Sequence, residues 1–198
     1  RLGIPQSAAI TCVKPSGTVS QLVDSASGIH ARHSPYYVRT VRGDNKDPLT
    51  TFMKDQGIPS EPDVFKPDQT TVFSFPVKAP NKAVVTSDLS AVDQLKMWLM
   101  YQRHWSEHKP SVTINVKKDE WFEVGTFVYE HFDEMSGVSF LPYNEHTYQQ
   151  APYQEIDKEE YKNILVTMPK TIDWSRLSEY EKEDTTTSSQ TMACTGDV

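Results

Sequence analysis

The stretch TCVKPSGTVSQL, residues 11–22, joins an apolar run to a tight turn and the start of a helix. The apolar residues that end at Val13 are followed by Pro15, Ser16, Gly17 and Thr18. Serine and threonine are favoured caps at helix N-termini, and glycine lets the backbone come close to a bound group. The order of residue types therefore predicts a strand, a turn and a short helix.

The turn has two interpretations on its residues alone. The first free N–H groups of a helix lie at the positive end of its dipole and form a binding site for anions such as phosphate. The same residues also suit an ordinary capped helix start after a strand, without any ligand. The turn chemistry leaves both interpretations open.

Composition bounds the class of protein. The chain has 198 residues, which is enough for one domain with a core, and a net charge of -7, which argues against a broad nucleic-acid surface. No apolar run approaches the ~20 residues of a membrane span, and no signal peptide is recognisable. The two cysteines, Cys12 and Cys194, are too few and too far apart for a secreted disulfide framework. We therefore expect a cytoplasmic protein that contacts neither nucleic acid nor membrane.

Periodicity predicts alternating strands and helices along the chain. Strands are expected over 4–13, 36–41, 70–77, 111–116 and 137–141, and helices over 19–23, 91–104, 119–135 and 158–165. A further helix is expected to start at Asp47-Pro48-Leu49 and to end at Gly57. Ser90 or Ser87 is expected to cap the helix over 91–104, and Asp119 the helix over 119–135. Strands that alternate with helices favour an α/β fold with parallel strands. The polar residues from Glu179 onward predict a mobile tail.

Longer segments resemble a known family. The turn with its flanks, the run SGIHARHSPYYVRTVR over 27–42, the segments Gly137–Pro142 and Tyr148–Tyr153, and the ending Ala193–Val198 are similar to the C-terminal part of ribonucleotide reductase catalytic chains. The resemblance is to the adenosylcobalamin-dependent (class II) ribonucleoside-triphosphate reductases. It covers nearly the whole chain, although the tail match rests on one cysteine and one glycine.

The resemblance implies an architecture. Residues 1–178 would form the C-terminal portion of the family's ten-stranded α/β barrel, and residues 179–198 a truncated, mobile redox tail. The absence of an initiator methionine and the ending just after a cysteine suggest a fragment of a longer polypeptide. Such a fragment is expected to have no turnover by itself.

The resemblance also implies roles for single residues. Ser16, Gly17, Thr18 and Val19 would hold the phosphates of the ribonucleotide substrate. Cys194 would belong to a cysteine pair that reduces the active-site disulfide and is reduced in turn by a thioredoxin-type partner, and its second member would have to lie beyond Val198.

Other residue patterns favour ordinary structural roles. Cys12 lies in the apolar run and is expected in the core, since buried cysteine is common. His104 and His108 have a spacing that suits zinc, but without a third ligand they are not expected to bind a metal. The basic residues of the loop over 30–33 favour a solvated loop over a contact with substrate or cobalamin.

The function implied by the resemblance is reduction of ribonucleoside triphosphates to their 2′-deoxy forms. Adenosylcobalamin would start a thiyl-radical mechanism, with electrons supplied through the tail. Two alternatives stay open: the large subunit of a diphosphate reductase that uses a separate radical subunit, and a nucleotide-binding α/β domain without catalysis.

Overall fold

The computed structural model describes residues 3–17, 19–143 and 149–182. The chain folds as two compact units, each made of two separate stretches of sequence. The first unit comprises Arg1–Pro35 with Ala79–His146, and the second comprises Tyr36–Lys78 with Thr147–Val198. The predicted division at residue 178 stays a prediction. However, α6 (Leu177–Tyr180) carries regular structure past the expected start of the tail.

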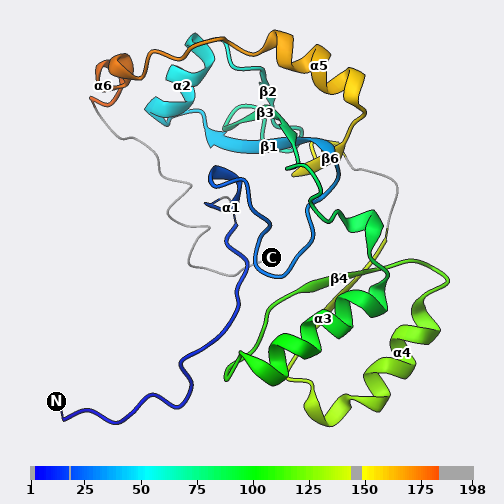
Figure 1. Cartoon of the computed structure of the whole chain (residues 1–198). Coiled ribbons are helices and arrows are strands. Elements are labelled where there is room, and N and C mark those ends of the chain that lie inside the picture. The colour runs from blue at the N-terminus through cyan, green and yellow to red at the C-terminus, as the bar shows by residue number, and fades with distance from the viewer. Residues whose placement is uncertain (1–2, 18, 144–148, 183–198) are drawn as a thin grey trace. The chain divides into compact units, whose positions relative to one another are not determined.

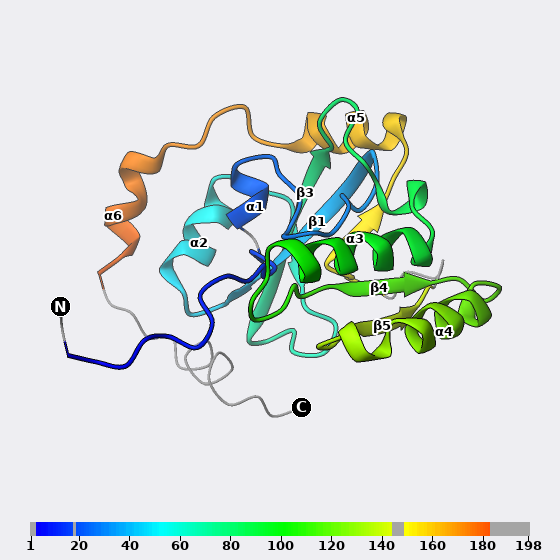
Figure 2. The same cartoon turned by 60° about the horizontal axis from the view of Figure 1, so that its bottom comes forward.

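The first unit contains a two-stranded sheet and two long helices. It holds α1 (Val19–Leu22), α3 (Ala91–His104), β4 (Thr113–Val116), α4 (Trp121–Glu130) and β5 (Ser139–Pro142). Strands β4 and β5 pair in parallel. Helix α3 runs beside β4 in both views (Figure 1, Figure 2). Strand β4, helix α4 and strand β5 follow one another along the chain, and together they form the parallel strand–helix–strand unit that the sequence predicts.

A single apolar cluster holds the first unit together. Trp98, Leu95 and Ile114 are fully buried in it. The indole N–H of Trp98 donates to the carbonyl oxygen of Pro110 at 2.8 Å, so the large ring is buried with its polar group paired. The apolar face of α3 therefore packs on the sheet as its periodicity predicts.

A local signal sets the start of α3. Ser90 is the N-cap, and its hydroxyl accepts from the Asp93 amide at 3.0 Å while Asp93 bonds back to Ser90. The prediction of Asp119 as cap for the next helix is wrong, because Glu120 holds the N-cap position of α4 without a side-chain capping bond. The Glu120 carboxylate instead accepts from the amides of Lys117 and Ala91, so it joins the starts of the two helices.

The second unit is built on an antiparallel sheet. Its strands are β1 (Tyr36–Asp44), β2 (Ser60–Pro62), β3 (Thr70–Lys78) and β6 (Tyr153–Glu155), in the order β2-β3-β1-β6. All three pairings are antiparallel. The prediction of parallel strands is wrong for this unit, because β1 and β3 pair antiparallel over their full length.

Helices pack on the second unit's sheet and on one another. These are α2 (Pro48–Asp55), α5 (Lys158–Thr167) and α6, with a 3-10 turn at Trp174–Arg176. Phe52 of α2 is fully buried and lies against the rings of Trp174 and Tyr180. The segment that leads into the predicted tail is therefore fastened to α2.

The fold class is mixed α/β, and both described sheets are open. The ten-stranded barrel stays a prediction. The expected buried strand over 4–13 is wrong in this structure: the segment has no regular strand, and Ile4 and Ile10 are 73% and 74% exposed. Only Val13 forms a bridge, parallel to Pro110. An apolar run becomes a buried strand only where other segments of the protein pack against it.

Candidate functional site

The Pro-Ser-Gly-Thr turn lies at the surface of the first unit and leads into α1. Gly17 has a φ of +59°, a left-handed conformation that other residue types adopt only with strain. Ser16 and Gly17 are exposed, and Val19 is 61% exposed. Thr18 lies outside the described residues. The turn and the short helix therefore form where the sequence predicts them.

Two of the four predicted phosphate donors already take part in hydrogen bonds. The amide of Ser16 donates to the hydroxyl of Ser27 at 2.9 Å. The amide of Val19 donates to the carbonyl oxygen of Ser16 at 3.2 Å. The Gly17 amide donates to no other described residue and stands at an exposed position. Of the predicted donors that the structure describes, the Gly17 amide is thus the one that could donate to a ligand without first giving up another hydrogen bond.

The loop over 25–30 packs against the turn and the residue before it. The sequence did not lead us to predict this contact. Gly28 has a φ of +60° and approaches the backbone of Lys14 so closely that a Cβ there would stand 3.0 Å from the Lys14 carbonyl oxygen. Ser27 contacts Ser16 through its hydroxyl. The small residues of Ser-Ala-Ser-Gly were the available signal, since close backbone approach requires residues of that size.

His30 fastens this loop to strand β4. Its Nδ1 lies 2.8 Å from the carbonyl oxygen of Ser27, and its Nε2 lies 3.1 Å from the amide nitrogen of Thr113. Arg32 is 4% exposed, donates to the Ser25 carbonyl oxygen at 2.6 Å and pairs with Asp24 at 3.2 Å. The expectation of a solvated basic loop is therefore wrong for Arg32, whose buried guanidinium binds the loop backbone, whereas His33 is exposed.

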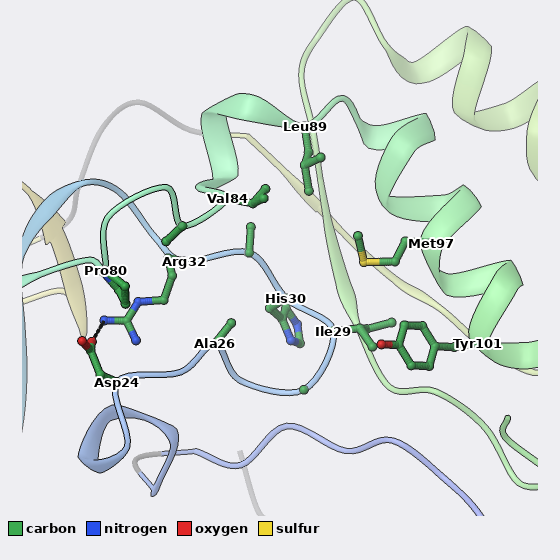
Figure 3. A pocket seen from close by; sticks show the side chains of 13 residues that line it. Asp24, Ala26, Ile29, His30, Arg32, Pro80, Val84, Leu89, Met97 and Tyr101 are labelled. Carbon is green, nitrogen blue, oxygen red and sulfur yellow. Dashed lines mark hydrogen bonds and ion pairs between the residues drawn. The ribbon is translucent and has the colours of Figure 1, made fainter.

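A pocket of about 290 Å³ lies beside this loop (Figure 3). Arg32 points toward Asp24 at one end, and Met97 and Tyr101 of α3 line the other. Apolar side chains supply much of the remaining lining, among them Ile29, Val84 and Leu89. Of the turn, the described residues Ser16, Gly17 and Val19 do not line it.

The segment before the turn is bound at the C-terminal end of α3. The amides of Ile10 and Thr11 donate to the Glu107 carboxylate, and these backbone hydrogen bonds lower the pKa of Glu107. The ammonium group of Lys14 donates to the Ser111 hydroxyl at 2.6 Å. Cys12 between them is exposed, so the expectation that it lies in the core is wrong. The thiol would be buried only if other residues packed over this segment, and the described residues do not.

The remaining candidate residues are not gathered into one site. Among the described residues, no group of three or more histidine, cysteine, aspartate or glutamate side chains is placed to hold a metal ion. This includes the surroundings of His104 and His108. Cys194 lies outside the described residues, and its predicted redox role stays a prediction.

Comparison with known proteins gives a consistent result. The chain is 34% identical over 166 residues to the adenosylcobalamin-dependent ribonucleoside-triphosphate reductase of Euglena gracilis, which covers 83% of this chain. It is 33% identical over 156 residues to the enzyme of the same name from Lactobacillus gasseri, covering 77% of this chain. No family model matches the chain.

A solved structure agrees with these relatives. The crystal structure of a B12-dependent (class II) ribonucleotide reductase matches with a TM-score of 0.72 and 29% identity over 86% of this chain. The matched part is 24% of that structure's chain, and this chain spans 23% and 21% of the two relatives. The similarity is therefore to one segment of much longer proteins.

Proposed function

Since this chain is homologous to a segment of the adenosylcobalamin-dependent ribonucleoside-triphosphate reductases, we propose that it serves the reduction of ribonucleoside triphosphates to 2′-deoxyribonucleoside triphosphates. The observation that carries the proposal is that the sequence match and the structure match each cover more than four-fifths of the chain. The described part of the chain contains no helix with the length and apolarity needed to cross a membrane.

The turn over 16–19 is proposed to hold the substrate phosphates. The exposed amide of Gly17 and the hydroxyl of Ser16 support this role, since oriented N–H and O–H donors bind phosphate oxygens. Thr18 and Val19 are proposed as further donors, and the Val19 amide would exchange its bond to Ser16 for one to phosphate.

Cys194 is proposed to carry reducing equivalents. Its thiolate would attack a sulfur of the active-site disulfide, and a second cysteine of the protein would then resolve the mixed disulfide. Two thiols become one disulfide, so two electrons and two protons pass to the active-site pair. A thioredoxin-type dithiol would reverse this oxidation. The polar composition around Cys194 supports the access that thiol exchange needs.

The cofactor would supply the radical chemistry, as the names of the relatives imply. The pocket beside the loop over 25–30 is not a site that fits it. Adenosylcobalamin is much larger than the 290 Å³ pocket beside the loop over 25–30. We therefore place none of its contacts on these residues, and the cofactor belongs to the proposal for the whole protein.

A substrate and cofactor panel tests this function. The intact protein that contains this chain is supplied with a small dithiol and either CTP or CDP, with and without adenosylcobalamin, and the deoxynucleotide product is measured. The proposal predicts conversion of CTP to dCTP only when adenosylcobalamin is present. Reduction of CDP that requires a separate radical subunit would replace the proposal by a diphosphate reductase. If the protein binds CTP but does not reduce it, the alternative of a nucleotide-binding domain without catalysis would be supported instead.

A further inference from the structure

The imidazole of His30 bridges two backbone groups whose chemistry fixes its state. The Ser27 carbonyl oxygen, 2.8 Å from Nδ1, can only accept a hydrogen bond, so Nδ1 must carry the proton. The Thr113 amide, 3.1 Å from Nε2, can only donate, so Nε2 must offer its lone pair. Both hydrogen bonds exist together only in the neutral ring with its proton on Nδ1.

The two partners of His30 belong to different parts of the first unit. Thr113 begins β4. Ser27 accepts from the Ser16 amide through its hydroxyl, and its carbonyl oxygen also accepts from the His30 amide at 3.1 Å. A continuous series of hydrogen bonds therefore runs from Thr113 through His30 and Ser27 to Ser16. Ser16 is thus connected to β4 through this histidine, in addition to the bonds that Val13 and Lys14 make with Ser111.

We propose that His30 is a positioning residue that holds the loop over 25–30, and with it Ser16, against β4 while the ring is neutral, and that protonation of the ring releases this attachment. The consequence for substrate binding rests on the function proposed above, whereas the attachment itself does not. A protonated ring presents an N–H at Nε2 to the N–H of Thr113, so two donors face each other. The hydrogen bond to Thr113 is then lost, while that to Ser27 can stay.

The charged groups around the ring do not alter this logic. Asp24 and Arg32 come from the same loop and pair with each other at 3.2 Å. Tyr101 of α3 lines the same pocket as His30. Lys14 is bonded to Ser111, two residues before Thr113. The ring nitrogens themselves face neutral backbone groups, so the direction of the effect follows from donor and acceptor roles.

Hydrogen exchange in the intact protein tests the attachment. Protection factors, corrected for intrinsic exchange, are measured for peptides that cover Thr113 and Ser16 between about pH 8 and about pH 5, the range over which histidine changes charge. Protection of Thr113 is expected to fall about fivefold toward the acid end, the effect of one hydrogen bond. His108→Gln, at an exposed histidine, is the control and should behave as the parent does.

Two substitutions at His30 separate its two hydrogen bonds. His30→Gln keeps an acceptor near the Nε2 position and cannot titrate, so its protection at Thr113 should stay high and independent of pH. His30→Asn keeps a donor near Nδ1 but no acceptor for Thr113, so its protection should be low at both ends of the range. The ¹⁵N shifts of His30 in the unsubstituted protein should report a proton on Nδ1, a readout that needs no variant.

The outcomes distinguish this inference from the proposed function. A proton on Nε2, or protection at Thr113 that does not change with pH in the parent, would overturn the attachment. If the attachment behaves as stated and His30→Asn raises the KM for CTP with little change in kcat, both proposals are supported. If the attachment behaves as stated while the KM for CTP is the same in the parent, His30→Gln and His30→Asn, the attachment stands and the phosphate role of the turn fails.

Discussion

Gln150 is 5% exposed and makes three side-chain hydrogen bonds around β2. Its amide nitrogen donates to the Glu61 carboxylate at 2.9 Å and to the Pro62 carbonyl oxygen at 2.8 Å, and its amide oxygen accepts from the Val64 amide at 2.9 Å. A buried amide with all these groups paired fixes the loops that meet it. The sequence places Gln150 in a segment that resembles the reductases but contains no signal for these partners, which lie 86 or more residues away.

Replacement of Gln150 by alanine should destabilise the protein by about 1–3 kcal/mol, since it removes the three hydrogen bonds of a buried side-chain amide. The free energy of unfolding from denaturant titration measures this. Gln149→Ala, at the exposed neighbouring position, is the control and should change it by about 0.5 kcal/mol or less. Equal effects of the two substitutions would contradict the role given to Gln150.

Residues that act through distant contacts explain most of what sequence reasoning missed at the site. The Pro-Ser-Gly-Thr turn and its left-handed glycine were predictable, because turn chemistry is local. Ser27 and His30 were not, because their importance depends on partners 11 and 83 residues away. Arg32 was expected in solvent, and only the fold shows that Asp24 and the loop backbone enclose it.

At the scale of elements, helices with complete local signals were predicted closely. The bounds of α3 agree with the sequence at both ends, because a capping box and a continuous apolar face define them. The segment over 4–13 was predicted as a buried strand and is exposed here, because its apolar residues carry no information about what covers them. The antiparallel sheet was also missed, since strand direction depends on how distant segments pair.

An ion-pair cluster joins the end of α3 to the turn after α4. Arg103 makes two hydrogen bonds of 2.6 Å to the Glu134 carboxylate, and His131 lies 3.1 Å from it. The hydrogen bond from Arg103, followed by that from His131, lowers the pKa of Glu134 to about 2. A carboxylate with a lowered pKa stabilises the fold above its ordinary pKa, and that contribution is lost as the pH falls toward the lowered value.

The melting temperature of the parent should therefore fall more steeply than that of Glu134→Gln as the pH is lowered from about 5 to about 2. Above this range, the parent should melt at the higher temperature. Thermal unfolding followed by circular dichroism across this pH range provides the comparison. Glu130→Gln removes an exposed carboxylate at the end of α4 and should keep the steep dependence of the parent. Parallel curves for the parent and Glu134→Gln would show that the cluster contributes nothing.

At the scale of the whole molecule, the chain corresponds to about a quarter of its reductase relatives. Both of its described sheets are open, and Ile4 and Ile10 of the segment before the turn are exposed. The sequence resemblance predicted adenosylcobalamin as the cofactor, and the names of the relatives give the same cofactor. The barrel and the redox tail stay predictions.

Replacement of Cys194 by serine in the intact protein should abolish most turnover with thioredoxin as reductant but leave activity with a small dithiol. The reason is that a small dithiol reaches the active-site disulfide without a relay. Steady-state deoxynucleotide formation with each reductant is the measurement. Cys12→Ser, at the exposed cysteine before the turn, is the control and should keep both activities. Unchanged turnover of Cys194→Ser with thioredoxin would remove the relay role.

The most direct test of the central claim locates substrate binding on the chain. Hydrogen exchange of the intact protein is followed with no ligand, with CTP and with cytidine at a concentration that occupies the protein equally. We predict that CTP slows exchange of the amides over residues 14–20 and that cytidine, which lacks phosphates, leaves them unchanged. Protection by CTP elsewhere in the protein, with exchange over 14–20 unaltered, would contradict the claim.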